Sequence, residues 1–305
     1  MKPSISIVIP TYQRPLKLLT AVSSALSACP SDGEVLVVDD MSDTARQALS
    51  DISTEPRLRI IDNALEKGAA GARNFGVAKA KSDIILFLDD DDELISDYPD
   101  RVLAAAQQSD ISFGFANVNI MNHSSEPPSL SLSKRSRHLV QGRIADHTPL
   151  EHKVFATGCG FWIRKTVFAD IGGIQTDQVV DEDTDLACRL YGNGYQGWFE
   201  APAGMLVHHR YSTVDGTSPH LSTGTKAAVV AACYARTFDN NQQLFLRQKH
   251  DRWFLYRRAL RNCAQNGVSD VARALLGKGQ PFSFRFQGWL YWQLKKAGRS
   301  LRRGP

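Results

Sequence analysis

The sequence has few cysteines and no long hydrophobic run. Its five cysteines are widely spaced and form no CxxC pair, which is typical of proteins in a reducing compartment and not of disulfide-bonded secreted domains. No stretch approaches the roughly 20 apolar residues that a helix needs to cross a bilayer. The apolar segment at residues 7–10 is too short for the hydrophobic part of a signal peptide. We therefore expect a cytoplasmic protein.

Charge is distributed unevenly along the 305 residues. Residues 247–305 hold 14 Lys and Arg against two Asp, whereas the preceding 246 residues carry a net charge of −8. An acidic body is suited to cations, and a basic tail to phosphates or an anionic membrane surface. No segment matches a nucleic-acid recognition motif, so we expect no nucleic-acid partner. With 43% hydrophobic residues, the chain can form one large domain and an appendage.

Short apolar runs alternate with helical patterns in the first hundred residues. The runs at 5–9, 34–38 and 84–88 are continuous, and helical patterns lie between them. This alternation predicts a parallel sheet in an α/β domain. Each of the three runs is followed by polar residues, in the sequences PTYQR, DDMSD and DDDDE. Since the ligands of such sheets gather at the carboxyl ends of the strands, we expect a binding site there.

The run 89-DDDDE-93 follows directly on the apolar strand predicted at 84–88. Strand alternation would direct Asp89 and Asp91 to one side and Asp90 to the other. Two carboxylates on one side can hold Mg²⁺ or Mn²⁺ and leave coordination positions open for phosphate oxygens. The alternative is an acidic turn that only faces water, and the buried strand before it argues against that alternative.

Several motifs in fixed order resemble glycosyltransferase family 2. They are 9-IPTYQRP-15, 35-VLVVDDMSD-43, 68-GAAGARNFGVAKAKSDIILFLDDDD-92, 172-GGI-174 and 182-EDTDLACRL-190. The resemblance spans about Ile5 to His209 and implies a GT-A fold, an α/β domain that is Rossmann-like, with a mostly parallel central sheet and flanking helices. We expect this domain at 1–224, with a nucleotide-sugar-binding half at 1–120 and an acceptor half at 150–211. Residues 225–305 are predicted to form a basic, helical C-terminal extension.

By the same resemblance, the nucleotide sugar binds to residues at the strand ends. Tyr12 would stack on the base or pack on the sheet edge. Of Asp39 and Asp40, one would accept a hydrogen bond from a pyrimidine and the other would cap the next helix. Arg73 would lie near the base or the diphosphate, or be an ordinary charge on a helix surface. The full set is Pro10, Thr11, Tyr12, Arg14, Asp39, Asp40, Gly71, Arg73, Asn74, Asp89 and Asp90.

The resemblance also implies a divalent metal, Mn²⁺ or Mg²⁺. In a DXD-like motif, Asp91 would bind the metal, and Asp89 would contact the ribose or a metal-bound water. His208 or His209 would be a further ligand of the metal or the diphosphate, or a structural histidine.

The second acidic run, 181-DEDTD-185, resembles the segment that carries the catalytic base in this family. Asp183 would be the base, and Glu182 its orienting neighbour. The alternative is a helix start that is capped by Asp181 or Thr184, with Arg189 as a charge partner.

These assignments imply a metal-dependent, inverting hexosyltransferase of bacterial polysaccharide or lipopolysaccharide assembly. Its donor would be a UDP- or dTDP-sugar, and its acceptor a hydroxyl of a glycan or a lipid-linked glycan. Processive synthases carry a Q-x-x-R-W motif, whereas here Gln248 and Arg252 are one residue too far apart, so we expect single additions. Met41 stands where the family usually has glycine. The alternative function is a non-catalytic nucleotide- or sugar-binding protein on the same fold.

The segment 282–303 combines aromatic and basic residues. Its aromatic residues Phe282, Phe286, Trp289, Tyr291 and Trp292 lie among lysines and arginines, which is the composition of a helix at a membrane interface. The alternative is that the aromatic side chains close the core of a helical cap. The first interpretation predicts peripheral attachment to the cytoplasmic face of the inner membrane.

Overall fold

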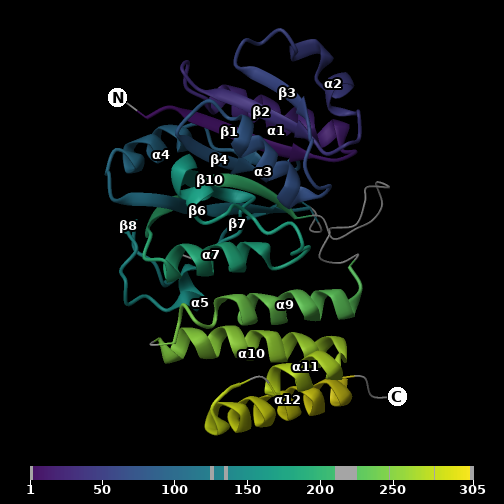
Figure 1. Cartoon of the computed structure of the whole chain (residues 1–305). Coiled ribbons are helices and arrows are strands. Elements are labelled where there is room, and N and C mark those ends of the chain that lie inside the picture. Colours follow the sequence, from purple (N-terminus) through teal and green to yellow (C-terminus); the bar gives the residue numbers. More distant parts are fainter. Residues whose placement is uncertain are drawn as a thin grey trace.

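The computed structural model describes residues 3–123, 127–133, 137–209, 225–246, 248–277 and 279–302. One large sheet with covering helices forms the body of the molecule. Four helices from the last quarter of the chain stack beside this body (Figure 1).

The described part of the chain forms a ten-stranded mixed sheet. Its strands are β1 (Ile5–Thr11), β2 (Glu34–Asp39), β3 (Leu58–Asp62), β4 (Ile84–Leu88), β5 (Glu93–Leu94), β6 (Ile111–Asn122), β7 (Ser129–Leu132), β8 (Gly142–Arg143), β9 (Cys159–Arg164) and β10 (Gln196–His209). Their order is β3-β2-β1-β4-β9-β6-β10-β5, with β7 paired to β6 and β8 to β10. β1 to β4 are parallel, as are β6 and β10, whereas β9 is antiparallel to both β4 and β6. The strands predicted in the first hundred residues are therefore present.

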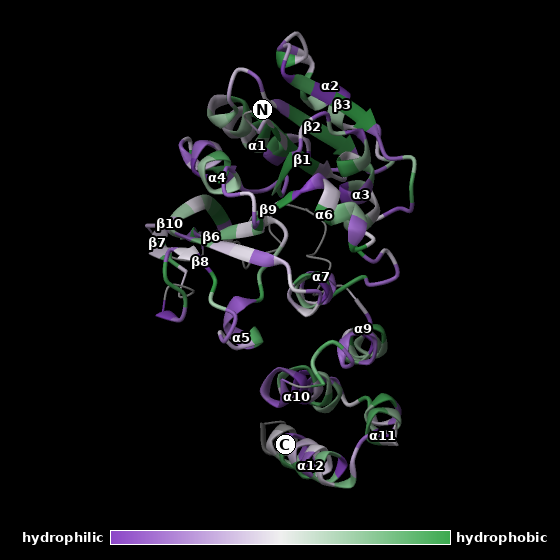
Figure 2. Ribbon diagram, turned by 60° about the vertical axis from the view of Figure 1, so that its left-hand side comes forward, coloured by the Kyte–Doolittle hydropathy of each residue, from purple (hydrophilic) through white to green (hydrophobic). Residues whose placement is uncertain are grey.

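Buried apolar residues explain why β1 lies in the middle of the parallel block. Ile5, Ile7 and Ile9 contribute to a core on one face, with α1 (Pro15–Ala28) and α4 (Tyr98–Ala106). Val8 contributes to a core on the other face, with α3 (Ala69–Lys79). This alternation is the two-residue period of a strand, and helices on both faces allow a continuous apolar run. Figure 2 shows the hydrophobic residues concentrated in β1, β2 and β3.

The shorter helices of the body connect the strands. They are α2 (Ala45–Ala48), a 3-10 turn (Ser50–Ile52), α5 (Leu150–Lys153), α6 (Lys165–Asp170) and α7 (Glu182–Gly192). The carboxyl ends of β1 and β4 lie side by side, because these strands are parallel neighbours. β2 flanks this pair on one side and β9 on the other, and the order of the strands changes direction between β1 and β4, which is the kind of position where open sheets bind ligands.

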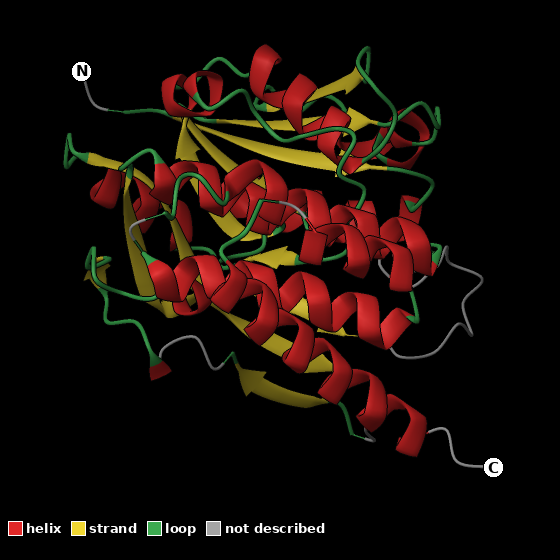
Figure 3. Cartoon of the chain, turned by 60° about the horizontal axis from the view of Figure 1, so that its bottom comes forward, coloured by secondary structure: helices red, strands yellow, loops and turns green. Residues whose placement is uncertain are grey.

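The extension consists of α9 (Ala227–Asn241), α10 (Lys249–Asn266), α11 (Ser269–Gly277) and α12 (Phe282–Arg302). These helices share a core of their own, to which Leu150 of α5 and Cys188 of α7 also belong. Asn241 donates to Asp185 of α7 at 2.7 Å, so the extension is fastened to that helix. Figures 1 and 3 show the extension layered beside α7 and the sheet. A helical C-terminal extension is thus confirmed.

Within the described ranges, we find no helix whose length and hydropathy together would allow it to cross a bilayer.

Candidate active site

The first acidic run meets Arg14 at the carboxyl ends of β1 and β4. Arg14 Nη1 lies 3.0 Å from both Asp90 Oδ1 and Asp91 Oδ2, and Lys17 Nζ lies 3.6 Å from Asp91. Thr11 donates its hydroxyl to Asp90 at 2.7 Å. Burial raises the pKa of Asp90 to about 6, although the Arg14 charge opposes this shift. The predicted alternation of the carboxylates is wrong, because β4 ends at Leu88 and the acidic run forms a turn.

Arg73 is a buried arginine of α3 that connects the two acidic segments. Its Nη2 donates to Asp89 Oδ1 at 2.6 Å, and only 6% of the residue is exposed. Burial alone would lower the pKa of Arg73, but the charges of Asp89, Asp183 and Glu182 outweigh this effect and raise it. A buried guanidinium is tolerated only with such partners. Arg73 is therefore not an ordinary surface charge.

Asp183 lies in the first turn of α7, next to Glu182. Thr157 donates its backbone N–H at 3.0 Å and its hydroxyl at 2.6 Å to Asp183 Oδ1. Among the described residues, Asp183 Oδ2 has no hydrogen-bond partner. Burial and the neighbouring Asp183 charge raise the pKa of Glu182. One carboxylate oxygen of Asp183 is thus fixed by Thr157, and the other makes no hydrogen bond to a described residue.

The alternative interpretation of this run, a helix start with Arg189 as charge partner, applies to residues other than Asp183. Asp181 precedes α7, but its side chain makes no capping hydrogen bond. Arg189 pairs with Asp185 at 2.8 Å within α7. Asp183 contributes to neither of these contacts.

Thr157 and Gly158, just before β9, are site residues that the sequence analysis missed. Thr157 holds Asp183, and Gly158 packs directly against Asp89. A Cβ at Gly158 would lie 1.8 Å from Asp89 Oδ2, so only glycine fits while Asp89 keeps this position. The available signal was the small-residue sequence 157-TGCG-160, which carries no chemical signature of its own.

Asp39 and Asp40 have different structural roles. Asp39 accepts hydrogen bonds from Ser42 and from Ala45 N–H, at 2.6–2.9 Å, in the loop into α2. Burial would raise the pKa of Asp39, but these hydrogen bonds outweigh it and lower it. Asp40 accepts from Asn63 and from Gly68 N–H, both at 2.8 Å.

Asp39 thus holds the loop into α2, and both oxygens of Asp40 are also engaged by described residues. A base contact by one of the two aspartates stays a prediction. Met41 has a φ of 61°, so the turn keeps the left-handed backbone that glycine adopts most easily.

Three more predicted nucleotide residues surround the strand ends. Tyr12 is 37% exposed, and Lys67 Nζ lies 4.4 Å from its ring centre. Gly71 allows α3 to approach the Glu66 carbonyl, since a Cβ there would lie 1.8 Å from that oxygen. Asn74 exchanges two hydrogen bonds with the backbone of Ile174, at 2.8 and 2.9 Å.

Asn74 therefore holds the Gly172-Gly173 turn in place beside α3. Pro10 is buried near the end of β1, and its contact with a nucleotide stays a prediction.

His208 is engaged through both ring nitrogens. Its Nε2 lies 2.8 Å from Glu93 Oε1, and its Nδ1 lies 2.8 Å from Nε2 of His123. Its backbone N–H donates to Asp92 Oδ1 at 3.0 Å. The side chain of His209 lies outside the described residues. A metal contact by His208 would require one of these two ring partners to move.

Asp89 and Asp91, the predicted metal ligands, are held by different cations, Arg73 and Arg14. Among the described side chains, no three His, Cys, Asp or Glu gather closely enough to form a complete metal site. Mg²⁺ often takes only one or two carboxylates and completes its shell with water and substrate phosphates. Asp89 and Asp91 each keep one oxygen without a hydrogen bond to a described residue.

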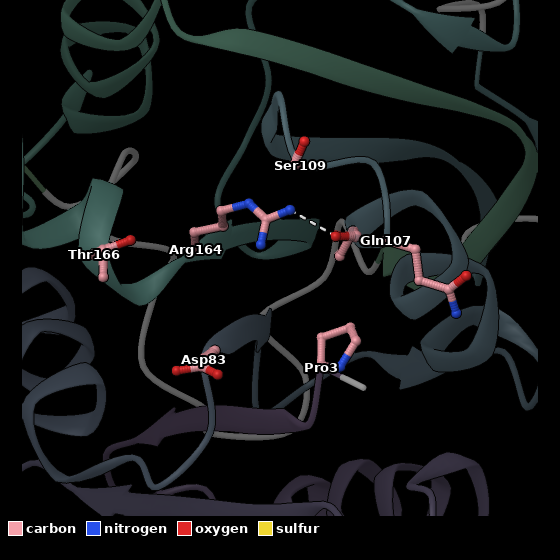
Figure 4. Close-up of a pocket in the computed structure, with 7 residues that line it drawn as sticks. Pro3, Asp83, Gln107, Ser109, Arg164 and Thr166 are labelled. Carbon is pink, nitrogen blue, oxygen red and sulfur yellow. Dashed lines mark hydrogen bonds between the residues drawn. The ribbon is translucent and has the colours of Figure 1, made fainter. Parts of the chain in front are cut away.

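A cavity of the described structure lies elsewhere. It has a volume of about 550 Å³ and is lined by Pro3, Asp83 and Arg164, among others, at the amino ends of β1 and β4. Figure 4 shows Arg164 reaching across this cavity toward the C-terminal end of α4. Arg164 donates to Ala106 O at 2.6 Å and to Gln108 O at 3.1 Å. Arg164 thus has a structural role, and the cavity is at the opposite end of the sheet from the carboxylates.

Comparisons with known proteins agree on one family. Residues 6–172 match the sequence model of glycosyl transferase family 2. The chain is 34% identical over 122 residues to WfgD of Escherichia coli, a UDP-Glc:alpha-D-GlcNAc-diphosphoundecaprenol beta-1,3-glucosyltransferase, and the match covers 40% of this chain and 48% of WfgD. It is 29% identical over 119 residues to the GalNAc(5)-diNAcBac-PP-undecaprenol beta-1,3-glucosyltransferase of Campylobacter jejuni, which covers 38% of this chain and 37% of that protein. The chain thus matches half or less of the length of these two relatives.

A solved structure shows the same fold. The crystal structure of S. aureus TarS 1–349 in complex with UDP-GlcNAc aligns with a TM-score of 0.66 at 16% identity, over 97% of this chain and 89% of TarS. This likeness confirms the predicted α/β fold of the GT-A type. Because the matched segment 6–172 covers more than half of its 305 residues, the chain belongs to glycosyl transferase family 2.

Proposed function

We propose that the protein is an inverting glycosyltransferase that moves a sugar from a nucleotide diphosphate to an acceptor hydroxyl. The single observation that carries this proposal is the position of Arg73. It is buried, it is hydrogen-bonded to Asp89, and its pKa responds to the charges of Asp183 and Glu182. Two acidic segments that are distant in the sequence therefore belong to one site. Transfer needs such a pair, since the leaving diphosphate and the attacking hydroxyl require different assistance.

The donor side of the site carries the groups that suit a leaving diphosphate. Arg14 and Lys17 lie beside Asp91, and fixed cations of this kind stabilise negative charge as it develops on the leaving group. Asp91 and Asp89 would hold Mn²⁺ or Mg²⁺ here, and the ion would supply Lewis-acid neutralisation of the diphosphate.

The acceptor side carries the base. Oδ2 of Asp183 accepts the proton of the acceptor hydroxyl, while Thr157 fixes Oδ1 and so sets the direction of the carboxylate. Direct attack from this side, opposite the leaving diphosphate, inverts the anomeric carbon. The raised pKa of Glu182 favours its neutral form, which limits the repulsion that a charged neighbour would exert on Asp183.

The named relatives support the choice of substrates. Both glucosyltransferases act, by their names, on undecaprenol diphosphate carrying a sugar. We extend this class to the present chain: a lipid-linked acceptor in cell-surface polysaccharide or lipopolysaccharide assembly, a UDP- or dTDP-sugar as donor, and one sugar added in each reaction.

The extension supports peripheral association with the cytoplasmic face of the inner membrane. Phe282, Phe286 and Trp289 of α12 are 81%, 55% and 46% exposed, whereas Trp292 is 5% exposed. The aromatic residues are thus divided between an outer stripe and the core of the extension. We propose 1–224 as the transferase domain and 225–305 as the part that meets the membrane.

The experiment is a thermal-shift screen of UDP, dTDP and their sugars, with and without Mn²⁺. We expect at least one nucleotide diphosphate to raise the melting temperature only when Mn²⁺ is present. Absence of any metal-dependent shift would contradict the proposal. A shift without any transfer of sugar would favour the alternative, a non-catalytic nucleotide- or sugar-binding protein.

A further inference from the structure

A second cationic site lies on the extension, away from the strand ends. Arg257, Arg258 and Arg261 of α10 line a pocket of about 240 Å³. Residues from α5 close one side of this pocket, and Tyr291 of α12 closes another. Three helices that are distant in the sequence thus form one concave surface.

The charges in this pocket are only partly compensated. Arg257 forms an ion pair with Glu151 of α5, and Arg258 forms one with the buried Asp181. Arg261 is exposed and has no ion-pair partner among the described residues. Guanidinium groups bind phosphates through several hydrogen bonds at once, so this set of arginines is suited to a phosphate or diphosphate.

One arginine of the pocket contacts the residue that lies two positions before the candidate base Asp183. Arg258 holds Asp181, and Asp181 immediately precedes Glu182 and Asp183 at the start of α7. An anion in the pocket would therefore lie on the side of the molecule that supports the base. The donor cations, Arg14 and Lys17, belong to a different part of the fold.

The aromatic residues of α12 lie on two faces. Tyr291 lines the pocket and packs against Trp253 of α10. Phe282, Phe286 and Trp289 are exposed on the opposite face of the helix. The pocket thus offers arginines for the phosphate groups of a lipid phosphate, and α12 offers a separate apolar face for a membrane.

We propose that the pocket of Arg257, Arg258 and Arg261 binds the phosphate groups of the lipid-linked acceptor and so places the acceptor sugar at Asp183. This inference rests on the proposed transferase function and adds a site for the acceptor. The phosphate of a bulk membrane phospholipid has the same chemistry, so the test separates the two sources.

The test compares Arg261→Gln with wild-type protein, and uses Arg273→Gln as a matched control. Arg273 lies on α11 of the same extension, is 69% exposed at its side chain, and does not line the pocket. Calorimetric titration with farnesyl diphosphate is carried out with saturating UDP and Mn²⁺, so that the donor site is occupied. We expect Arg261→Gln to weaken farnesyl diphosphate binding about tenfold or more, because a charged hydrogen-bonding group is lost. Arg273→Gln should bind like wild type.

Two further measurements make each outcome decisive. We expect Arg261→Gln and Arg273→Gln to bind phosphatidylglycerol vesicles equally well. If Arg261→Gln alone lost vesicle binding to the same extent as farnesyl diphosphate binding, the pocket would be assigned to bulk phospholipid and the proposal would be overturned. Unchanged farnesyl diphosphate affinity in Arg261→Gln would overturn it as well. The UDP- and Mn²⁺-dependent thermal shift should be the same in both variants, and its absence in wild type would reject the transferase function independently of the pocket.

Discussion

At the scale of single residues, Gly158 determines where Asp89 can lie. The backbone before β9 approaches the carboxylate so closely that a methyl group would overlap Asp89 Oδ2. Asp89 in turn accepts a hydrogen bond from Arg73, and the charges of Asp183 and Glu182 raise the pKa of Arg73. One glycine thus supports the arrangement of both acidic segments.

We predict that Gly158→Ala lowers turnover about 100-fold while the protein still folds, because Asp89 must move by an ångström or more and positioning errors of that size are costly. The measurements are sugar transfer and the Mn²⁺-dependent thermal shift with UDP. Gly277→Ala is the control, since a Cβ there meets no atom within 4 Å. Full activity in Gly158→Ala would show that the close approach has no role.

The sequence indicated the charged residues of the candidate site, but not the residues that hold them in position. Asp89, Arg73 and Asp183 follow recognisable motifs, and the structure brings them together. Thr157 and Gly158 could not be predicted, because their role depends on how closely β9 passes two distant carboxylates. Asn74 was expected at the nucleotide, and its amide holds the backbone of Ile174, a contact that the sequence did not indicate.

At the scale of elements, Glu34 connects the amino ends of β1, β2 and the chain before β4. It accepts hydrogen bonds from Ser6 Oγ at 2.7 Å, Lys81 N–H at 2.6 Å and Arg59 at 2.6 Å, and it is 6% exposed. Burial alone would raise the pKa of Glu34, but the hydrogen bonds from Lys81, Arg59 and Ser6 outweigh it and lower the pKa. The charged form is therefore favoured by folding.

We predict that Glu34→Gln lowers the free energy of unfolding at pH 7 by about 2 kcal/mol, since hydrogen bonds to the charged carboxylate are lost. A lowered pKa stabilises the fold above the unfolded value of about 4.3, and this contribution disappears as the pH falls through the folded value. The difference between wild type and variant should shrink below about pH 4, as urea unfolding at pH 7 and pH 3.5 would measure. A difference that stays constant with pH would contradict this role.

Helix α12 is the element where sequence analysis left two interpretations open. Its pattern of aromatic residues predicted either an interfacial helix or a core helix, and the structure divides them between both positions. Trp292 belongs to the core of the extension, and Phe282 lies on the exposed side. Composition could not separate these positions, because the division depends on which face packs against α10.

We predict different effects from the two faces of α12. Replacing Phe282, Phe286 and Trp289 by serine should weaken binding to phosphatidylglycerol vesicles at least about tenfold and leave the melting temperature nearly unchanged, because these side chains are exposed. Trp292→Ala should instead lower the free energy of unfolding by about 3 to 5 kcal/mol. Co-sedimentation and denaturant unfolding measure the two effects. Unchanged vesicle binding by the triple serine variant would exclude the membrane role of the exposed face.

At the scale of the whole molecule, distant segments of sequence form one site because of the sheet order. β9 inserts between β4 and β6, and this places the chain of Thr157 and Gly158 beside the first acidic run. The extension then supports α7 from the other side through Arg258 and Asn241. Motif order predicted the α/β body, but the insertion of an antiparallel strand and the contacts of the extension depend on tertiary packing.

The measurement that tests the transferase account most directly is the effect of Asp183→Asn on transfer and on donor binding. Transfer of labelled sugar from a panel of UDP- and dTDP-sugars into a lipid extract measures turnover, and calorimetry with UDP and Mn²⁺ measures donor affinity. Loss of the general base predicts about 1000-fold lower turnover, with the donor Kd within about twofold of wild type because the donor side is intact. Turnover that survives in Asp183→Asn would contradict the account.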